Sequence, residues 1–544
     1  MLVSTMLGVF RSMVLARELD RVEQEMVRRG EASFHVSGGG HESTAVLASL
    51  LHETDFLHLH YRDKALMIAR GMPLHGFLDA LLCNVRSTSA GRNMVAHFTS
   101  KEHNVVSMPT PVSNNALHAC GVASAIRDTP SRPIVYCANG DGTTQQGEFY
   151  EAIAEAAREN LPVLFMIQDN GLAISTSTVG RTFYQHNSGS EDAFHGVPIH
   201  RCDGRDPVSM YGKFTEIIST MREDRRPVIT VLDVERLSDH TNADDQRIYR
   251  TEESIACAHR DGDPVRFLRG WLLAQSCPEG DLLEIERQAI ETVATAELDA
   301  LGVLDPILTN TAKTILPVEL THPSREVRGK DDRNGITMKE AMRRVFKDWL
   351  DRDQRVTLFG QDIEDPKGDV FGVTKGLSTQ FPGRVINAPL SEATIVGTAV
   401  GRALAGERPV AFLQFADFVP MAFNQIACEM SSMDWRSNGE WQAPVVLMAP
   451  YGGYRPGLGP FHSHSMEAIT AHCPGLDVFV PSTAADAAGI INAALQSTRP
   501  SVVFYPKSLL NDPAGATAAE GVEENFAPIG VARKIRAGRD ITLV

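Results

Sequence analysis

The sequence Ala138-Asn139-Gly140-Asp141-Gly142 lies between a stretch with the apolar pattern of a strand and a stretch with the apolar spacing of a helix. The apolar, β-rich run 133–137 before it is typical of a buried strand, whereas apolar residues recur at helical spacing over 149–157. A second apolar run, 163–167, follows this helical region. The order strand, glycine-rich turn, helix, strand predicts a parallel sheet of the α/β class.

Polar residues leave both predicted strands, Asp141 after the first and Asn170 after the second. Because the carboxyl ends of parallel strands lie at one edge of a sheet, we expect these side chains together, where open α/β sheets bind ligands. A helix N-terminus favours phosphate there, and two oxygen ligands suit Mg²⁺. A Gly-Asp-Gly sequence alone is a weak signal, because a βα turn can contain it by chance, but Asn170 strengthens the interpretation.

Composition excludes several classes of protein. The net charge of -16 argues against nucleic-acid binding, which needs a surplus of Lys and Arg. No apolar run reaches the roughly 18 residues of a membrane span, and the charged second half of 1–30 indicates an amphipathic helix, not a signal peptide. The eight cysteines form no CxxC motif, so neither a zinc nor a redox pair is indicated. We therefore expect a cytoplasmic protein with no membrane or nucleic-acid partner.

The segment from Gly140 to Thr176, GDGTTQQGEFYEAIAEAARENLPVLFMIQDNGLAIST, resembles the thiamin-diphosphate signature. It is similar to the α subunit of the E1 component of 2-oxo-acid dehydrogenase complexes, above all the branched-chain (2-oxoisovalerate) type. The resemblance implies thiamin diphosphate and Mg²⁺ as cofactors, with the metal held by Asp141, Asn170 and the carbonyl of Leu172. Gln168 departs from the branched-chain pattern, which often has an Arg there that contacts the diphosphate.

Further motifs extend the resemblance through the first half. The glycine-rich segment 33–42 resembles one that approaches the active site in E1 α subunits, although its composition also suits a flexible loop. Tyr61-Arg62 falls where these subunits hold the diphosphate, and Arg suits a fork-like grip on phosphate, although such a dipeptide is commonly a surface pair. The cofactor-binding residues implied in this half are Tyr61, Arg62, Thr110, Val112, Gly140, Asp141, Gly142, Thr143, Gln168 and Asn170.

Two of these positions have particular roles in the family. Val112 falls on an apolar wedge that bends the cofactor, and Thr110 on a hydroxyl that contacts it. Core packing is the alternative for Val112, since Val is among the residues most often buried. Asn114 and Asn115 stand where some members hold K⁺, so the resemblance adds K⁺ as a further cofactor.

Two later loops bear on function. The polar segment 175–197 has no periodicity and predicts a long structureless loop of the kind that forms lids. The stretch 236–250 resembles an E1 loop with a catalytic His, which implies a catalytic role for His240, although a loop His is usually only polar. Thr241 stands where animal E1 enzymes carry a regulated Ser, but one hydroxyl does not indicate regulation.

The second half begins after a charged stretch, 317–335, that we interpret as a linker. From Ile336 the chain resembles an E1 β subunit, so an α-like and a β-like subunit are fused. Glu392 heads an apolar helix, where a Glu commonly only stabilises the helix dipole. The resemblance instead makes Glu392 the catalytic carboxylate that hydrogen-bonds the aminopyrimidine in a dry site. It also places Phe418 on that ring and makes His462 a catalytic proton-transfer residue.

Two details of this half depart from the branched-chain pattern. That type usually has Tyr at the position of Phe418, whereas the pyruvate type has Phe. His464 replaces a usual Gln and lies close to His462, a spacing that could suggest a metal site, but no carboxylate or Cys lies near the pair in the sequence.

The resemblance implies a fold of two doubly wound parallel-sheet domains that bind thiamin diphosphate, with the start of a third α/β domain. The expected divisions are an α-like domain at 1–316, the linker 317–335, a pyrimidine-binding β-like domain at 336–510 and an incomplete domain at 511–544, where 540–544 begins a strand. We expect the chain to be truncated or incomplete at this end.

The implied reaction is oxidative decarboxylation of a 2-oxo acid, branched-chain before pyruvate or acetoin, with acyl transfer to a lipoylated E2 partner. The catalytic residues would be Glu392, His240 and His462. A homodimer of fused chains is expected, and the sequence leaves open whether each site lies within one chain or between two. Two alternatives remain: a thiamin transferase of the transketolase kind, and a cofactor-binding subunit without activity.

Overall fold

The computed structural model describes residues 2–303, 316–453 and 458–542. Contacts divide the chain into two compact units. The first comprises Met1–Lys313 with Val400–Ala405 and Ser432–Gln442, and the second comprises Thr314–Ala399, Gly406–Ser431 and Ala443–Val544. No helix in the described ranges combines the length and the apolar character that crossing a membrane requires.

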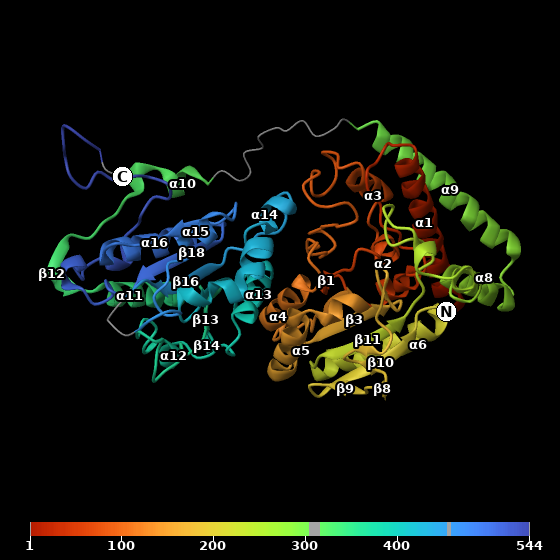
Figure 1. Cartoon of the computed structure of the whole chain (residues 1–544), viewed down its shortest axis with the longest axis horizontal. Coiled ribbons are helices and arrows are strands. Elements are labelled where there is room, and N and C mark those ends of the chain that lie inside the picture. Colours follow the sequence, from red (N-terminus) through yellow and green to blue (C-terminus); the bar gives the residue numbers. More distant parts are fainter. Residues whose placement is uncertain (1, 304–315, 454–457, 543–544) are drawn as a thin grey trace. The chain divides into compact units, whose positions relative to one another are not determined.

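A six-stranded sheet forms the centre of the first unit (Figure 1). Its neighbours pair in parallel except for one edge strand, β9, which is antiparallel to β10. The central strands are buried along almost their whole length, which agrees with the continuous apolar runs of their sequences. In spatial order the strands are β1 (Phe56–His58), β2 (Val135–Gly140), β3 (Val163–Asp169), β11 (Val228–Asp233), β10 (Val197–Asp203) and β9 (Ala193–Phe194).

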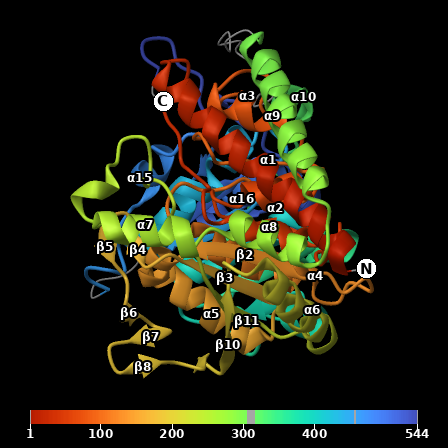
Figure 2. The ribbon, with the colours of Figure 1, turned by 90° about the vertical axis from the view of Figure 1, so that its right-hand side faces the viewer.

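Helices surround this sheet, and the first of them is the longest. The predicted N-terminal helix is confirmed as α1 (Leu2–Arg28), which runs beside α9 (Glu279–Leu301) (Figure 2). Aspartates cap α6 and α8, each followed by a proline in the first turn. The other helices are α2 (Lys64–Ala69), α3 (Leu74–Leu81), α4 (Asn114–Ile126), α5 (Gly147–Glu159), α6 (Pro207–Asp224), α7 (Glu252–Asp261) and α8 (Pro264–Ala274), with 3₁₀ turns η1 (Glu42–Ser49), η2 (Asp141–Gln145) and η3 (Gln246–Ile248).

The expectation of a structureless loop over 175–197 is wrong. The segment folds into two-residue strands, whose pairing satisfies backbone groups that a long loop would leave to water. Within it Phe183 and Tyr184 are buried, and the Tyr184 hydroxyl donates to Asp169 at 2.9 Å, which ties the segment to the end of β3. The strands are β4 (Leu172–Ala173) with β5 (Thr176–Ser177), and β6 (Arg181–Thr182), β7 (Gln185–His186) and β8 (Gly189–Ser190).

The second unit also contains a six-stranded sheet, in which all strands are parallel. In spatial order they are β14 (Val385–Asn387), β13 (Val356–Gly360), β15 (Arg408–Phe412), β16 (Val446–Tyr451), β18 (Ser501–Pro506) and β17 (Asp477–Phe479). The chain reverses its direction of travel across the sheet between β13 and β15, so the carboxyl ends of these two strands form a topological switch point.

Several helices belong to this half of the sequence. The predicted helix after Ile336 is confirmed as α11 (Met338–Arg352), and it packs against α16 (Ala484–Gln496). The remaining ones are α10 (Val318–Thr321), α12 (Leu377–Gln380), α13 (Glu392–Leu404), α14 (Met433–Arg436) and α15 (Glu467–Ala471), with the short turns η5 (Pro323–Arg325), η6 (Ala416–Ala422), η7 (Gln425–Met430), η8 (Pro513–Gly515) and η9 (Val522–Glu524).

The stretch interpreted as a linker carries structure of its own. It includes α10, η5 and most of β12 (Asp331–Ile336), and it forms bridges with Thr517 and Phe526. Leu320 is the buried residue of α10, and it packs with Phe526 in a small apolar cluster. The predicted C-terminal strand is not seen over 540–542, and 543–544 lie outside the described residues.

Candidate active site

The predicted metal ligands lie at one edge of the first sheet. Strands β2 and β3 pair in parallel with Gly140 opposite Gln168, so Asp141 and Asn170 leave neighbouring strands at the same end. Asp141 is only 3% exposed, and its Oδ2 accepts a hydrogen bond from the Thr178 hydroxyl. Burial raises the pKa of Asp141 to about 6 despite this bond. A buried carboxylate of this kind favours either a proton or a bound cation.

Gly142 brings the turn after Asp141 into close contact with β4. A Cβ at Gly142 would lie 2.7 Å from the Cβ of Ala173, so only glycine fits without movement of β4. Leu172, whose carbonyl is the third predicted ligand, precedes Ala173 in this strand, and its N–H donates to Asn170 Oδ1 at 3.2 Å. Carboxylate, amide and carbonyl oxygens are the donor types that Mg²⁺ prefers. The three segments that carry the predicted ligands are therefore neighbours.

A pocket beside this edge collects four of the predicted cofactor residues. Tyr61, Thr110, Val112 and Thr143 all line it. The side chain of Val112 is exposed, at 47%, so core packing does not explain it. His60 and Ser113 also line the pocket, and their Nδ1 and Oγ atoms are buried without a hydrogen-bond partner among the described residues.

Arg62 and His240 contact each other deep in the first unit. Arg62 is 2% exposed, and its guanidinium donates to the Ser37 carbonyl and, at 3.2 Å, to Nδ1 of His240. Because a guanidinium can only donate, His240 Nδ1 must accept, and the neutral ring carries its proton on Nε2. Burial, together with the positive charges of Arg62 and Arg236, lowers the pKa of His240 to about 4. His240 is therefore neutral near pH 7.

Gln168, expected to face the cofactor, is bonded at both ends of its amide to other side chains. It is fully buried, its Oε1 lies 2.7 Å from His41 Nδ1, and its Nε2 donates to Asp63 at 2.6 Å. Burial lowers the pKa of His41 to about 3, so His41 is a neutral donor to Gln168. These contacts support a role behind the pocket and not a direct contact with a diphosphate.

Sequence reasoning missed four residues of this region: His41, His60, Asp63 and Thr178. Three of them lie in motifs that the sequence analysis describes. His41 follows the three glycines, and His60 and Asp63 flank Tyr61-Arg62. Thr178 carried no signal, because its contact with Asp141 depends on how the 175–197 segment folds. At the predicted K⁺ site, Asn114 and Asn115 are buried at the start of α4, and Asn115 donates to the Ala138 carbonyl at 3.2 Å.

The remaining predicted residues belong to the second unit. Glu392 is the first residue of α13 and is buried, as its expected role requires. Phe418 lies in η6, after β15 at the topological switch point, and its ring centroid is 5.9 Å from that of His462. Phe415 lies closer to His462, at 4.6 Å in an edge-on arrangement.

The loop that carries His462 is anchored at this residue and at the two residues that follow it. The buried Lys507 donates to the His462 carbonyl, and Asp417 accepts from the backbone N–H groups of Ser463 and His464 at 3.2 and 3.0 Å. The sequence showed no acidic neighbour for the two histidines, but the fold brings Asp417 within 3.2 Å of His464 Nδ1. His464 is thereby bound to Asp417 and does not pair with His462.

Two protein families match consecutive parts of the chain. The family described as dehydrogenase E1 component matches residues 10–300, more than half of the 544 residues. The pyrimidine-binding domain of transketolase matches residues 334–513. The two matches meet the predicted order of an α-type part followed by a β-type part.

Curated relatives align with one half or the other. The 2-oxoisovalerate dehydrogenase subunit beta of Bacillus subtilis (strain 168) is 41% identical over 206 residues, which are 38% of this chain and 62% of the relative. The mitochondrial 2-oxoisovalerate dehydrogenase subunit alpha of Mus musculus is 28% identical over 270 residues, 49% of this chain and 61% of the relative. The pyruvate dehydrogenase E1 component subunit beta of Leifsonia xyli subsp. xyli (strain CTCB07) is 38% identical over 210 residues, 38% and 60% of the two chains.

The chain thus spans about 60% of the length of the curated relatives it matches. Subunits that are separate proteins in these relatives correspond to successive parts of one polypeptide here, which confirms the predicted fusion. Because the family model matches more than half of its length, the chain belongs to the dehydrogenase E1 component family.

Proposed function

We propose that this chain is a thiamin-diphosphate-dependent E1 enzyme that oxidatively decarboxylates a branched-chain 2-oxo acid and passes the acyl group to a lipoylated E2 partner. The observation that carries the proposal is the convergence of Asp141 and Asn170 at the ends of neighbouring parallel strands, in a chain of the dehydrogenase E1 component family. Relatives of both halves are named 2-oxoisovalerate dehydrogenase, which supports the branched-chain substrate.

The first unit would hold Mg²⁺ and the diphosphate. Asp141, Asn170 and the Leu172 carbonyl fit the metal by donor type. Burial raises the pKa of Asp141, and a nearby cation would favour its charged form. Tyr61 and the unpartnered groups of His60 and Ser113 offer hydrogen bonds to phosphate oxygens. Arg62 supplies a positive charge beside Tyr61, with its guanidinium carbon 5.1 Å from the centroid of that ring.

His240 would act through its Nε2–H. Arg62 occupies Nδ1, so the neutral ring can donate a hydrogen bond from Nε2 to a ligand oxygen but cannot accept a proton there. A pKa of about 4 means that this state persists across the physiological range. We therefore assign His240 the task of donating to oxygen atoms on which negative charge develops.

The residues of the second unit would serve the organic part of the cofactor. Thiamin diphosphate would supply a nucleophilic carbon that adds to the 2-oxo group and a cationic thiazolium ring that accepts the electron pair released with CO₂. Glu392, buried at the start of α13, would share a proton with the aminopyrimidine ring nitrogen, and Phe418 would pack on that ring. His462, with its backbone fixed by Lys507 and by the N–H bonds of the next two residues to Asp417, would hold or release a proton at its ring nitrogens.

A pyruvate-specific enzyme is the second candidate. Phe418 stands where the branched-chain type usually has Tyr, and some relatives of the second half are named pyruvate dehydrogenase. The proposal further includes a homodimer of fused chains, a cytoplasmic location, and K⁺ bound near Asn114 and Asn115.

The testing experiment is 2-oxo-acid-dependent reduction of an artificial electron acceptor with thiamin diphosphate and Mg²⁺. The substrate panel contains branched-chain 2-oxo acids, pyruvate and 2-oxoglutarate. Turnover of the branched-chain acids above the others is expected, and preferential turnover of pyruvate would replace the substrate assignment. Cofactor binding without turnover of any acid would favour a transketolase-like transferase or an inactive subunit.

A further inference from the structure

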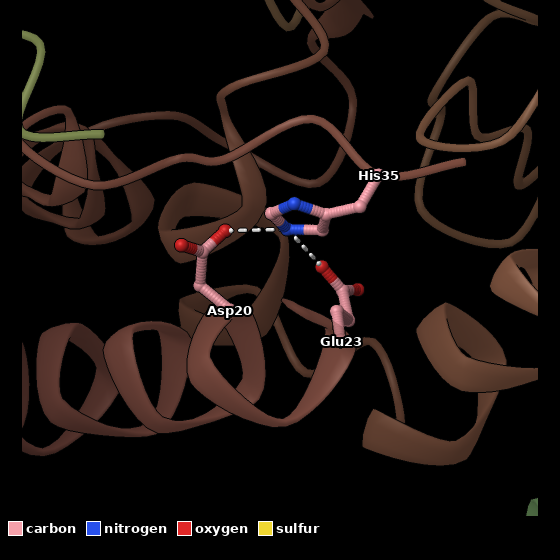
Figure 3. A group of neighbouring side chains, drawn as sticks. All are labelled: Asp20, Glu23 and His35. Carbon is pink, nitrogen blue, oxygen red and sulfur yellow. Dashed lines mark hydrogen bonds and ion pairs between the residues drawn. The ribbon is translucent and has the colours of Figure 1, made fainter. Parts of the chain in front are cut away.

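Four ionisable side chains are buried together behind the candidate site. Asp20 and Glu23 come from α1, His35 from the glycine-rich segment, and Lys64 from the start of α2. Figure 3 shows the ring of His35 between the two carboxylates, with Nε2 at 3.1 Å from Asp20 Oδ1 and 3.3 Å from Glu23 Oε2. Lys64 Nζ donates to Glu23 and lies 3.6 Å from Asp20. All four residues are at most 3% exposed.

The charges of this group balance within it. Burial alone would lower the pKa of His35, but its bonds to Asp20 and Glu23 raise it above its ordinary value. Burial would likewise raise the pKa of Asp20, but His35 and Lys64 hold it well below its ordinary range. The raised pKa favours the charged form of His35, and Lys64 lies beside the same two carboxylates. Lys64 Nζ and His35 Nε2 each lie close to both carboxylates, so these two side chains can supply the positive charge that a bound cation would otherwise bring.

The ion network is connected to Arg62 through the glycine-rich segment. Asp20 accepts from the Ser37 hydroxyl at 2.6 Å and from the Gly38 N–H at 2.9 Å. The carbonyl of Ser37 in turn accepts from Nη1 of Arg62, whose Nη2 donates to His240. Asp20 on α1 thus holds Ser37 in place, and the Ser37 carbonyl in turn orients Arg62, the predicted phosphate-binding residue that contacts His240.

A second connection runs to the loop of His240. The Asn242 side chain accepts from the His35 N–H at 3.0 Å, and the Asn242 N–H donates to the His35 carbonyl at 3.2 Å. The glycine-rich segment also touches the strand end that leads to this loop, since a Cβ at Gly40 would clash with the Glu235 carbonyl. Both sides of the Arg62–His240 contact therefore rest on the same segment.

Burying four charges is costly, and apolar residues of similar volume often stabilise such a position better. Stability therefore does not explain the network, whereas a need for one defined geometry does. We propose that Asp20, Glu23, His35 and Lys64 are positioning residues that fix the Ser37–Gly40 backbone, and through it the guanidinium of Arg62 and the Nε2–H form of His240. The inference deepens the proposed function and rests on it for the roles of Arg62 and His240.

The test compares Asp20→Asn with Met13→Ala in the full chain. Met13 is a buried residue of α1 two turns before Asp20, so its truncation weakens α1 without removing a bond to the segment. Hydrogen exchange of the cofactor-free protein is measured over 36–42 and 237–244, together with the affinity for inorganic pyrophosphate and the melting temperature. We expect Asp20→Asn to speed exchange in both segments and to weaken pyrophosphate binding at least tenfold, while Met13→Ala lowers only the melting temperature.

If both variants change exchange and affinity alike, or neither does, the positioning role is refuted. Should Asp20→Asn fail to fold, the double variant Glu23→Gln/Lys64→Met removes one ion pair at nearly constant volume and must show the same faster exchange. Failure of the unaltered protein to bind pyrophosphate or thiamin diphosphate would count against the proposed function. The exchange measurement needs no ligand, and it still decides the network's effect on the segment.

Discussion

Gly142→Ala tests the metal site through a single methyl group. The added Cβ would lie 2.7 Å from the Cβ of Ala173 in β4. Carbon atoms in contact are usually about 3.5 Å apart or more, so β4 must move by about 0.8 Å. The Cβ of Ala173 is attached directly to the backbone, and no flexible side chain can absorb the displacement. The adjacent Leu172 carbonyl, a predicted Mg²⁺ ligand, moves with the strand.

The magnitude follows from packing and from the demands of the ion. Overpacking of this kind costs roughly 1–3 kcal/mol. Mg²⁺ requires nearly ideal octahedral geometry, so it cannot follow a displaced carbonyl without loss of affinity. If the strain appears as weaker binding, the dissociation constant for Mg²⁺ should rise about 5- to 150-fold.

Isothermal titration with Mg²⁺ in the presence of thiamin diphosphate measures this change. Gly147→Ala is the matched control, because a Cβ at Gly147, the first residue of α5, meets nothing within 4 Å. The control should keep its Mg²⁺ affinity and gain up to about 1 kcal/mol of helix stability. Equal Mg²⁺ affinity in Gly142→Ala, Gly147→Ala and the unaltered protein would refute the reasoning that β4 carries a ligand.

Three further predictions concern the other site residues. Asp141→Ala should abolish Mg²⁺-dependent binding of thiamin diphosphate, measured by fluorescence titration, and retained binding would remove Asp141 from the metal site. Glu392→Gln should keep diphosphate affinity but lose exchange of the cofactor C2 proton, followed by NMR; unchanged exchange would contradict its role. The pKa of His240 is about 4 in the folded protein, below its value in the unfolded chain. Between these two pKa values the unfolded state binds more protons than the folded state. The free energy of unfolding therefore falls as the pH drops from about 6.5 to 4. After a discount for partial exposure, His240→Gln should recover about 1–2 kcal/mol of this loss in urea titrations at pH 4.5, and no difference from the unaltered protein would contradict the assignment.

Local patterns predicted most of the central elements correctly. The runs 163–167 and 228–232 lie within β3 and β11, whereas β2 begins at Val135, two residues into the run 133–137. These parallel strands are buried, and buried parallel strands have continuous apolar sequences that a single-chain pattern reveals. The prediction of a structureless loop over 175–197 was wrong because two-residue strands are too short for any periodicity to appear in the sequence. The stretch 317–335, interpreted as a linker, contains a four-residue helix that no periodicity could reveal, and the buried side chain of Leu320 packs in a small apolar cluster.

The amino-acid sequence by itself determined the chemistry and its order: an acid and an amide after successive strands, Tyr61-Arg62, and a carboxylate heading an apolar helix in the second half. These features are local, because a strand end and the residue after it are neighbours in the chain. Only the tertiary structure decided which side chains meet over long separations. It turned Gln168 toward His41 and Asp63, placed Thr178 on Asp141, and brought α1 behind Arg62 and His240. Such contacts depend on how elements pack, and no spacing along the sequence encodes them.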